Sequence, residues 1–398
     1  MFVSKSINSE HTDLIHDIAY DFYGKRMATC SSDQMVKIWD MKENGDWIST
    51  ARWRNHSGPV WRMDWAHPEF GQMIATCSFD RTIEIWEEIS NPSKMVSEQP
   101  GLDETSASSK CQSNTNWVKR TTLVDPRTSV VDIQFAPRYM GLRLAAISSD
   151  GFLRIYEAED VMNLSQWTLQ FDFPTKMIGS CLSWSQSRLD VPLIAVGSNA
   201  SDSIEKAFST HLQEQMNKSF NTTTGSINQS QGSGRLALCE FIEGQRQWNI
   251  VENVKCVNTA VFDVSFSPHL GQSFQLLAVA TENEVLILRI TCKDVPGEAD
   301  VNSKAMSRMS YNVYKLASFD HHKGRVWRLS WNITGSLLAS SGEDGCVRLW
   351  QSNYLDNWQC VGVISNSNQL CIPPNVLENR DMSDPRVATS MFAFNAMT

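Results

Sequence analysis

The sequence predicts an all-β fold, a β-propeller built from six four-stranded blades. Apolar residues alternate with a period of two along much of the 398-residue chain, and long helical patterns are scarce. One stretch, HSGPVWRMDWAHPEFGQMIATCSFDRTIEIWE (56–87), has a counterpart, HHKGRVWRLSWNITGSLLASSGEDGCVRLW (321–350), in which His322, Gly324, Trp327 and Trp331 repeat the spacing of His56, Gly58, Trp61 and Trp65. Repetition of a unit that holds four short strands is typical of propeller blades.

Six units align on the aromatic residue that closes the first strand of each. These residues are Tyr20, Trp65, Phe135, Trp184, Phe266 and Trp331. A second strand of small residues follows, then a turn and an alternating third strand. In four units the turn carries an Asp, with an aromatic residue six positions later. The pairs are Asp33/Trp39, Asp80/Trp86, Asp150/Tyr156 and Asp344/Trp350.

Units four and five lack this Asp and aromatic pair. Their second and third strands are predicted at 193–198 and 235–241, and at 276–281 and 285–290. More polar fourth strands are predicted for the other units and for unit four, at 47–53, 117–123, 167–173, 248–254 and 358–365.

The propeller is therefore expected to span residues 1–365, interrupted by three polar insertions at 91–116, 199–233 and 292–310. Low apolar content and enrichment in Ser, Asn and Gln are typical of mobile segments, so we expect mobile loops there. The polar tail, 366–398, shows no repeat pattern and is expected to be disordered.

The recurring residues predict a hydrogen-bonded network inside each blade. A His at the start of a unit can bind a Ser or Thr and the turn Asp, so that buried polar groups are paired. The aromatic residue at the end of the third strand then covers the sheet. We expect such networks at His11, Asp33 and Trp39, at His56, Asp80 and Trp86, in part at Asp150 and Tyr156, and at His322, Asp344 and Trp350.

Charge and cysteine content exclude several classes of function. The net charge is −9 without a Lys/Arg cluster, which argues against direct nucleic-acid binding. The ten Cys residues form no Cys-x-x-Cys pair, so we read them as reduced thiols and expect no cofactor and no metal. No apolar run reaches the length of about 18 residues that a membrane span needs.

The recurring His and Asp residues fit a structural role better than a catalytic or metal-binding one. His56 and His322 recur at one repeat position with an Asp 24 or 22 residues later, so blade architecture explains them better than metal binding or base catalysis. The four turn Asp residues occupy equivalent turns of different blades. Acid/base work needs two carboxylates close together, so no enzymatic activity is predicted. Arg62 and Arg328 are expected to form blade-to-blade ion pairs.

The specific motifs WAHPEFG (65–71) and YEAEDVMNLSQW (156–167), together with HTDLIHDIAYDFYGKRMATCSSDQMVKIWD (11–40), resemble the SEH-type nucleoporins, WD-repeat proteins related to the Sec-thirteen coat protein. The resemblance covers about residues 7–365. It implies an open six-bladed propeller, completed by a seventh blade from an α-helical scaffold nucleoporin. It also implies the Y-shaped outer-ring complex of the nuclear pore as the assembly, with a location at the nuclear envelope.

The same resemblance implies a second assembly, the GATOR-two complex, which acts in TOR kinase signalling at the lysosomal membrane surface and in the cytoplasm. A peptide-recognition adaptor, such as a substrate receptor of a ubiquitin ligase, is the alternative hypothesis. One propeller architecture hosts both kinds of function.

The open ring also has support in the residues. The sixth unit supplies its own fourth strand at 358–365, so the leading segment is left without a partner strand. An unpaired strand edge invites pairing with another chain. We therefore predict that a partner strand is bound by residues of the leading segment and of the first strands of units one and six, namely Phe2, Val3, Ile7, Ile15, Ile18, Val326 and Leu329.

Overall fold

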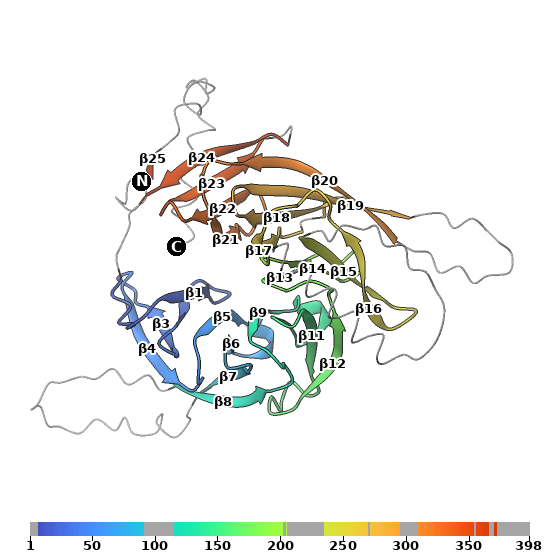
Figure 1. The fold of residues 1–398 in the computed structure, drawn as a ribbon. Coiled ribbons are helices and arrows are strands. Elements are labelled where there is room, and N and C mark those ends of the chain that lie inside the picture. The colour runs from blue at the N-terminus through green and yellow to red at the C-terminus, as the bar shows by residue number, and fades with distance from the viewer. Residues whose placement is uncertain are drawn as a thin grey trace, which may run out of the picture. The chain divides into compact units, whose positions relative to one another are not determined.

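The computed structural model describes residues 7–90, 115–201, 204, 235–269, 271–294, 309–353, 356–365 and 370–371. The described strands form six antiparallel sheets, one for each predicted blade, and the protein is an all-β six-bladed propeller (Figure 1). They divide into two units, of which one holds blades one to three and the other holds blades four to six.

The first unit contains twelve strands in three sheets. Blade one consists of β1 (Ile15–Tyr20), β2 (Arg26–Ser31), β3 (Met35–Met41) and β4 (Trp47–Arg54). Blade two consists of β5 (Val60–Trp65), β6 (Met73–Ser78), β7 (Ile83–Ser90) and β8 (Thr115–Leu123). Blade three consists of β9 (Val130–Phe135), β10 (Arg143–Ser148), β11 (Phe152–Ala158) and β12 (Trp167–Pro174).

The second unit contains the remaining strands. Blade four consists of β13 (Cys181–Trp184), β14 (Leu193–Gly197), β15 (Leu236–Ile242) and β16 (Gln247–Asn253). Blade five consists of β17 (Val261–Phe266), β18 (Gln275–Thr281), β19 (Val285–Asp294) and β20 (Met309–Phe319). Blade six consists of β21 (Val326–Trp331), β22 (Leu337–Gly342), β23 (Val347–Ser352), β24 (Trp358–Ile364) and β25 (Leu370–Cys371).

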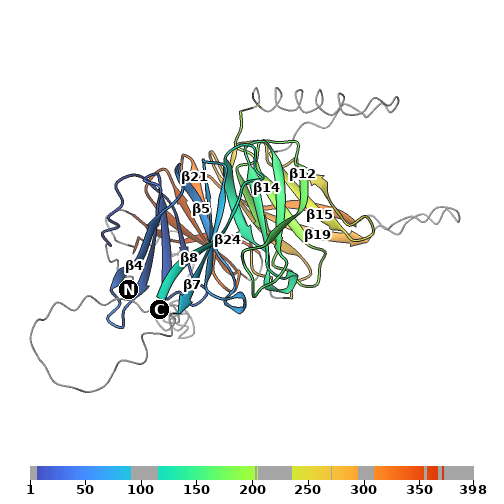
Figure 2. The ribbon, with the colours of Figure 1, turned by 90° about the horizontal axis from the view of Figure 1, so that it is seen from below.

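Within each sheet the strands pair in chain order, so the first strand lies at one edge and the later strands follow outward. Figure 2, turned by 90°, shows paired neighbours such as β14 and β15 side by side. The second strands are runs of small and apolar residues because both of their faces are covered, and β6 and β14 are buried along their whole length.

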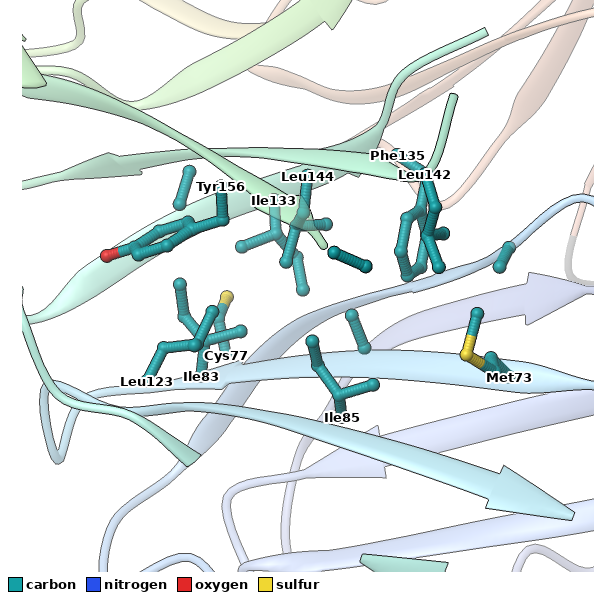
Figure 3. Close-up of a cluster of buried hydrophobic side chains, with 14 of the residues drawn as sticks. Met73, Cys77, Ile83, Ile85, Leu123, Ile133, Phe135, Leu142, Leu144 and Tyr156 are labelled. Carbon is teal, nitrogen blue, oxygen red and sulfur yellow. The ribbon is translucent and has the colours of Figure 1, made fainter. Parts of the chain in front are cut away.

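Neighbouring blades of a unit stack through apolar side chains. Between blades two and three, Met73, Ile83 and Ile85 face Ile133 and Leu144 (Figure 3). Similar clusters join blade one to two, blade four to five, and blade five to six. Burial of apolar area in these layers holds each unit together.

Three boundaries differ from the sequence prediction. Blade five has a fourth strand, β20, that the pattern did not reveal, and the long β19 pairs with it over its full length. Residues 292–294 and 309–310, expected in a loop, therefore belong to strands, as do residues 115 and 116. Residues 370–371, expected in the tail, form β25 against Val363 and Ile364. Most of the three insertions and of the tail lie outside the described residues.

Candidate functional site: an exposed face on blade one

The first strand of a blade, here called its inner strand, is shaped by a bulge. Pairing between the inner and the second strand is shifted between Ile15 and Asp17, between Val60 and Arg62, and between Val326 and Arg328. A bulge adds one residue and changes the alternation of side chains beyond it. Consequently the first, fourth and sixth residues of an inner strand all point to one side.

That side packs against the preceding blade. Val60, Met63 and Trp65 of blade two lie in one apolar cluster with Ala28 and Ile38 of blade one. The same rule holds in the other blades that have a preceding blade in their unit. The first residue of these strands is fully buried and the fourth is at most 8% exposed.

Blade one departs from this rule. Ile15, Ile18 and Tyr20 occupy the first, fourth and sixth positions of β1, and their side chains are 39%, 53% and 56% exposed. Burial of one large apolar side chain is worth about 1.5–3 kcal/mol. An aliphatic and aromatic face of this kind, on a strand whose counterparts are buried, is typical of a binding surface.

The prediction that Val326 and Leu329 bind a partner strand is wrong, because these residues do not lie on an exposed face. They are the first and fourth residues of β21, and they are buried against blade five together with Ala278 and Ile287. Sequence alternation shows that two residues share a side of a strand. It does not show whether that side meets the preceding or the following blade.

The partly exposed face of blade six lies on the other side of its sheet from Val326 and Leu329. In blades one and five the second and third strands bury Ala28, Ile38, Ala278 and Ile287 under the next inner strand. The equivalent residues of blade six, Ala339, Val347 and Leu349 among them, are partly exposed. Of the other predicted partner-binding residues, Ile7 is exposed, whereas Phe2 and Val3 lie outside the described residues.

The predicted networks form inside the blades and account for the repeated His, Asp and Trp residues. In blade one, His11 Nδ1 lies 2.9 Å from Asp33 Oδ2, and His11 Nε2 lies 2.9 Å from Thr29 Oγ1. Trp39 Nε1 donates to the same hydroxyl at 3.0 Å. One assignment satisfies every group: the indole donates to the hydroxyl, the hydroxyl donates to His Nε2, and His Nδ1 donates to the carboxylate.

Blade six has the same contacts with Ser340 as the hydroxyl residue, and in addition Arg348 Nη1 lies 2.7 Å from His322 Nδ1. Trp350 Nε1 donates to Ser340 Oγ at 2.8 Å, Ser340 Oγ lies 2.7 Å from His322 Nε2, and His322 Nδ1 lies 3.0 Å from Asp344 Oδ1. Burial and the nearby guanidinium of Arg348 lower the pKa of His322. The imidazole is therefore neutral, as the network requires.

Blades two and three carry variants. His56 binds Asp80 at 3.1 Å and Thr76 at 2.9 Å, but Trp86 Nε1 donates to Glu84 at 3.2 Å instead of to the threonine. In blade three, Arg154 replaces the histidine and donates to Ser148 at 2.5 Å and to Asp150 at 3.1 Å.

The turn carboxylates are held ionised. Burial raises the pKa of Asp33, Asp80 and Asp344, but hydrogen bonds from the partner histidines and from backbone N–H groups outweigh it, so the pKa of each lies below its usual value. Tyr156 stands in the place of the closing Trp, and burial raises the pKa of its hydroxyl. All four groups thus have structural surroundings, in agreement with the structural interpretation of the repeat.

A feature that the sequence analysis missed is an ionisable residue two positions before each closing aromatic. In blades two, three and six its side chain binds a member of the network, whereas in blade one it donates to the carbonyl of Ser9 at 2.8 Å. These residues are Lys37, Glu84, Arg154 and Arg348. An ionisable residue directly between two apolar residues of the third strand was the available signal, because such a residue is buried only when it is paired.

Polar side chains of the inner strands bind the next blade. Asp17 Oδ2 accepts from the backbone N–H of Met63 at 3.1 Å, and Asp263 Oδ2 accepts from that of Leu329 at 2.8 Å. Arg62 Nε lies 3.4 Å from Asp132 Oδ1, which confirms the blade-to-blade pairing predicted for this arginine.

Asp64 is a further carboxylate of this kind. It accepts from the backbone N–H of Phe135 at 2.7 Å and from that of Trp65 at 3.0 Å. Burial, reinforced by the nearby Asp17 and Asp132, raises the pKa of Asp64 to about 7.

Within the described ranges, no group of three or more His, Cys, Asp or Glu side chains is arranged to hold a metal ion. No helix in that part of the chain is long and apolar enough to cross a membrane.

Blades of four antiparallel strands with His, Ser/Thr, Asp and Trp networks define a WD-repeat β-propeller. A family model described as "WD domain, G-beta repeat" matches residues 4–40, 47–87 and 314–351. The crystal structure of the mitotic checkpoint complex contains a chain with a similar fold, at a TM-score of 0.52 and 13% identity, covering 86% of this chain and 76% of that one.

Within the WD-repeat propellers, the proteins most informative about the family are nucleoporins. Nucleoporin SEH1 of Osmerus mordax is 47% identical over 92% of this chain and 87% of its own length. Nucleoporin SEH1 of Homo sapiens is 44% identical over 98% of this chain and 95% of its own length, and that of Xenopus tropicalis is 47% identical over 92% and 89%. The chain belongs to the SEH1 nucleoporin family, whose members are non-enzymatic structural proteins of the nuclear pore complex.

Proposed function

We propose that this chain is a scaffold subunit of the Y-shaped outer-ring complex of the nuclear pore and supports nucleocytoplasmic transport through that role. Its partner is an α-helical nucleoporin that donates a β-blade. The observation that carries the proposal is the exposure of Ile15, Ile18 and Tyr20, whose counterparts in other blades are buried under a neighbouring blade.

A donated blade would cover this face in the way that blade one covers the inner strand of blade two. It would also cover Val347 and Leu349 on the partly exposed face of blade six. Strand addition supplies backbone hydrogen bonds together with apolar burial, so it combines affinity with register. A partner that binds only the folded chain also stabilises it by mass action.

The test is co-expression with a helical outer-ring nucleoporin and measurement of stoichiometry and melting temperature. We expect a one-to-one complex that melts above the isolated chain. I18D should abolish the complex while it lowers the unfolding free energy of the isolated chain by only about 1 kcal/mol, because the side chain is already half exposed. I333D, at an exposed isoleucine in a blade-six loop, is the matched control and should bind normally.

A complex formed equally well by I18D would contradict the proposal. So would an experimental structure of the isolated chain in which residues 2–7 pair with blade six and close the ring. Membership of a GATOR-two assembly at the lysosomal surface is proposed from the family alone, and the same I18D and I333D pair tests whether it uses this face.

A further inference from the structure

The turn between β6 and β7 of blade two departs from the repeat at two positions. The turns of blades one, three and six read Ser-Asp-Gln, Ser-Asp-Gly and Glu-Asp-Gly, whereas blade two reads Phe79-Asp80-Arg81. Phe79 is 57% exposed and packs edge-on against Trp61, with ring centroids 5.7 Å apart. An apolar ring thus occupies a surface position that is polar in the sibling blades.

Arg81 is the second departure. It has a left-handed backbone with φ = 71°, and blades three and six place Gly151 and Gly345 at this position with φ = 72° and 67°. A residue with a Cβ atom pays about 1–2 kcal/mol for this conformation, which glycine adopts freely. Gln34 fills the position in blade one, where its side chain accepts two hydrogen bonds from Arg54.

No comparable hydrogen bond accounts for an arginine at this strained position of blade two. Its side chain is exposed and makes no hydrogen bond or ion pair with any other residue in the described ranges. Strained positions that nothing in the fold requires are concentrated at functional sites. The guanidinium is therefore available for a ligand.

The side chains of Phe79 and Arg81 border one hollow of about 700 Å³ between blades two and three. Its lining is completed by Ser57, Asp80, Thr82, Thr128 and Ser129. Thr128 Oγ1 is buried and has no hydrogen-bond partner among the described residues.

The turn is held rigidly. Asp80 accepts hydrogen bonds from the backbone N–H groups of Ser57 at 2.8 Å and Thr82 at 3.0 Å, and from the Thr82 hydroxyl at 2.6 Å. Phe79 N donates to the carbonyl of Pro59 at 3.1 Å. Asp80 is thus occupied by the blade, and Phe79 and Arg81 are presented in a fixed geometry at low entropic cost.

We propose that this hollow binds an extended peptide of another protein in which an anionic side chain lies next to an apolar one. The carboxylate or phosphate pairs with the Arg81 guanidinium, and the apolar side chain packs on Phe79 and Trp61. A single arginine on a chain of net charge −9 suits one anionic side chain and does not suit a nucleic-acid backbone.

The probes are three fluorescein-labelled nine-residue peptides with the core Leu-X-Leu-X, where X is Glu, phosphoserine or Gln. We expect the full-length chain to bind the Glu or the phosphoserine peptide saturably in fluorescence anisotropy, and at least tenfold more tightly than the Gln peptide. A preference between the two anionic peptides identifies the anion as a carboxylate or a phosphate.

The variants use residues of the sibling blades, which keeps the turn foldable. R81G should weaken binding of the anionic peptide at least tenfold while it preserves or raises the melting temperature, and F79S should weaken binding of all three peptides. Q34G, the matched change in blade one, should leave binding unchanged. Equal binding by R81G and the wild type, or failure of the folded wild type to bind either anionic peptide, would overturn the proposal.

Discussion

Replacement of Ser340 by Ala should destabilise blade six, because one hydroxyl there serves two buried groups. Ser340 Oγ accepts from Trp350 Nε1 at 2.8 Å and contacts His322 Nε2 at 2.7 Å, and both rings are almost completely buried. An unpaired buried polar group costs about 1–3 kcal/mol. We therefore expect S340A to lower the unfolding free energy by about 2–4 kcal/mol, measured by urea denaturation and by thermal melting.

The chain provides two comparisons. S340T retains the hydroxyl, and Thr29 fills the same role in blade one, so S340T should retain most of the stability. T76A is the informative contrast. In blade two Trp86 donates to Glu84, so loss of the Thr76 hydroxyl leaves only His56 Nε2 unpaired, and the cost should be about 1–2 kcal/mol.

The ratio of these effects is the decisive result. Equal losses for S340A and T76A would show that the indole bond contributes nothing. Equal losses for S340A and S340T would show that packing of the side chain matters and hydrogen bonding does not. Either result would refute the assignment of donors and acceptors in the network.

The pKa of Asp64 is raised to about 7, so the folded chain binds more protons than the unfolded chain between about pH 4 and 7 and loses stability as the pH rises. The unfolding free energy of D64N relative to that of the wild type should therefore rise across this window, by roughly 4 kcal/mol at most. If urea titrations at pH 4.5 and 7.5 gave the same difference between D64N and the wild type, the raised pKa would be refuted. At Gly197 a Cβ atom would lie 2.6 Å from Cys181 Sγ and 2.7 Å from Val261 Cγ1, so G197A should lower the melting temperature clearly, whereas G324A, whose nearest contact is 3.7 Å, should not. Trp39, Trp86 and Trp350 are buried, so each change to Ala should cost about 3–5 kcal/mol; a variant that melts normally but loses its partner would mark a contact residue instead.

The sequence by itself determined the number of blades, most of their strands and the composition of the internal networks. These features depend on local periodicity, because a blade is one unit of chain whose strands pair in order. His11, Asp33 and Trp39 could be assigned together since their spacing recurs elsewhere in the chain. Strand β20 was missed because it follows an insertion and lacks the Trp that marks the beginning of most other fourth strands.

Only the tertiary structure decided which face of each inner strand is covered. Ile18 and Leu329 occupy the same repeat position, and the sequence gives no reason to separate them. Leu329 is buried because blade five precedes it, whereas Ile18 is exposed because no blade of its unit precedes blade one. Burial depends on the neighbour that a residue meets in space, and local pattern carries no information about that neighbour. For the same reason, only the structure showed that the Arg81 side chain has no hydrogen-bond or ion-pair partner among the described residues and that it lines one hollow with Phe79.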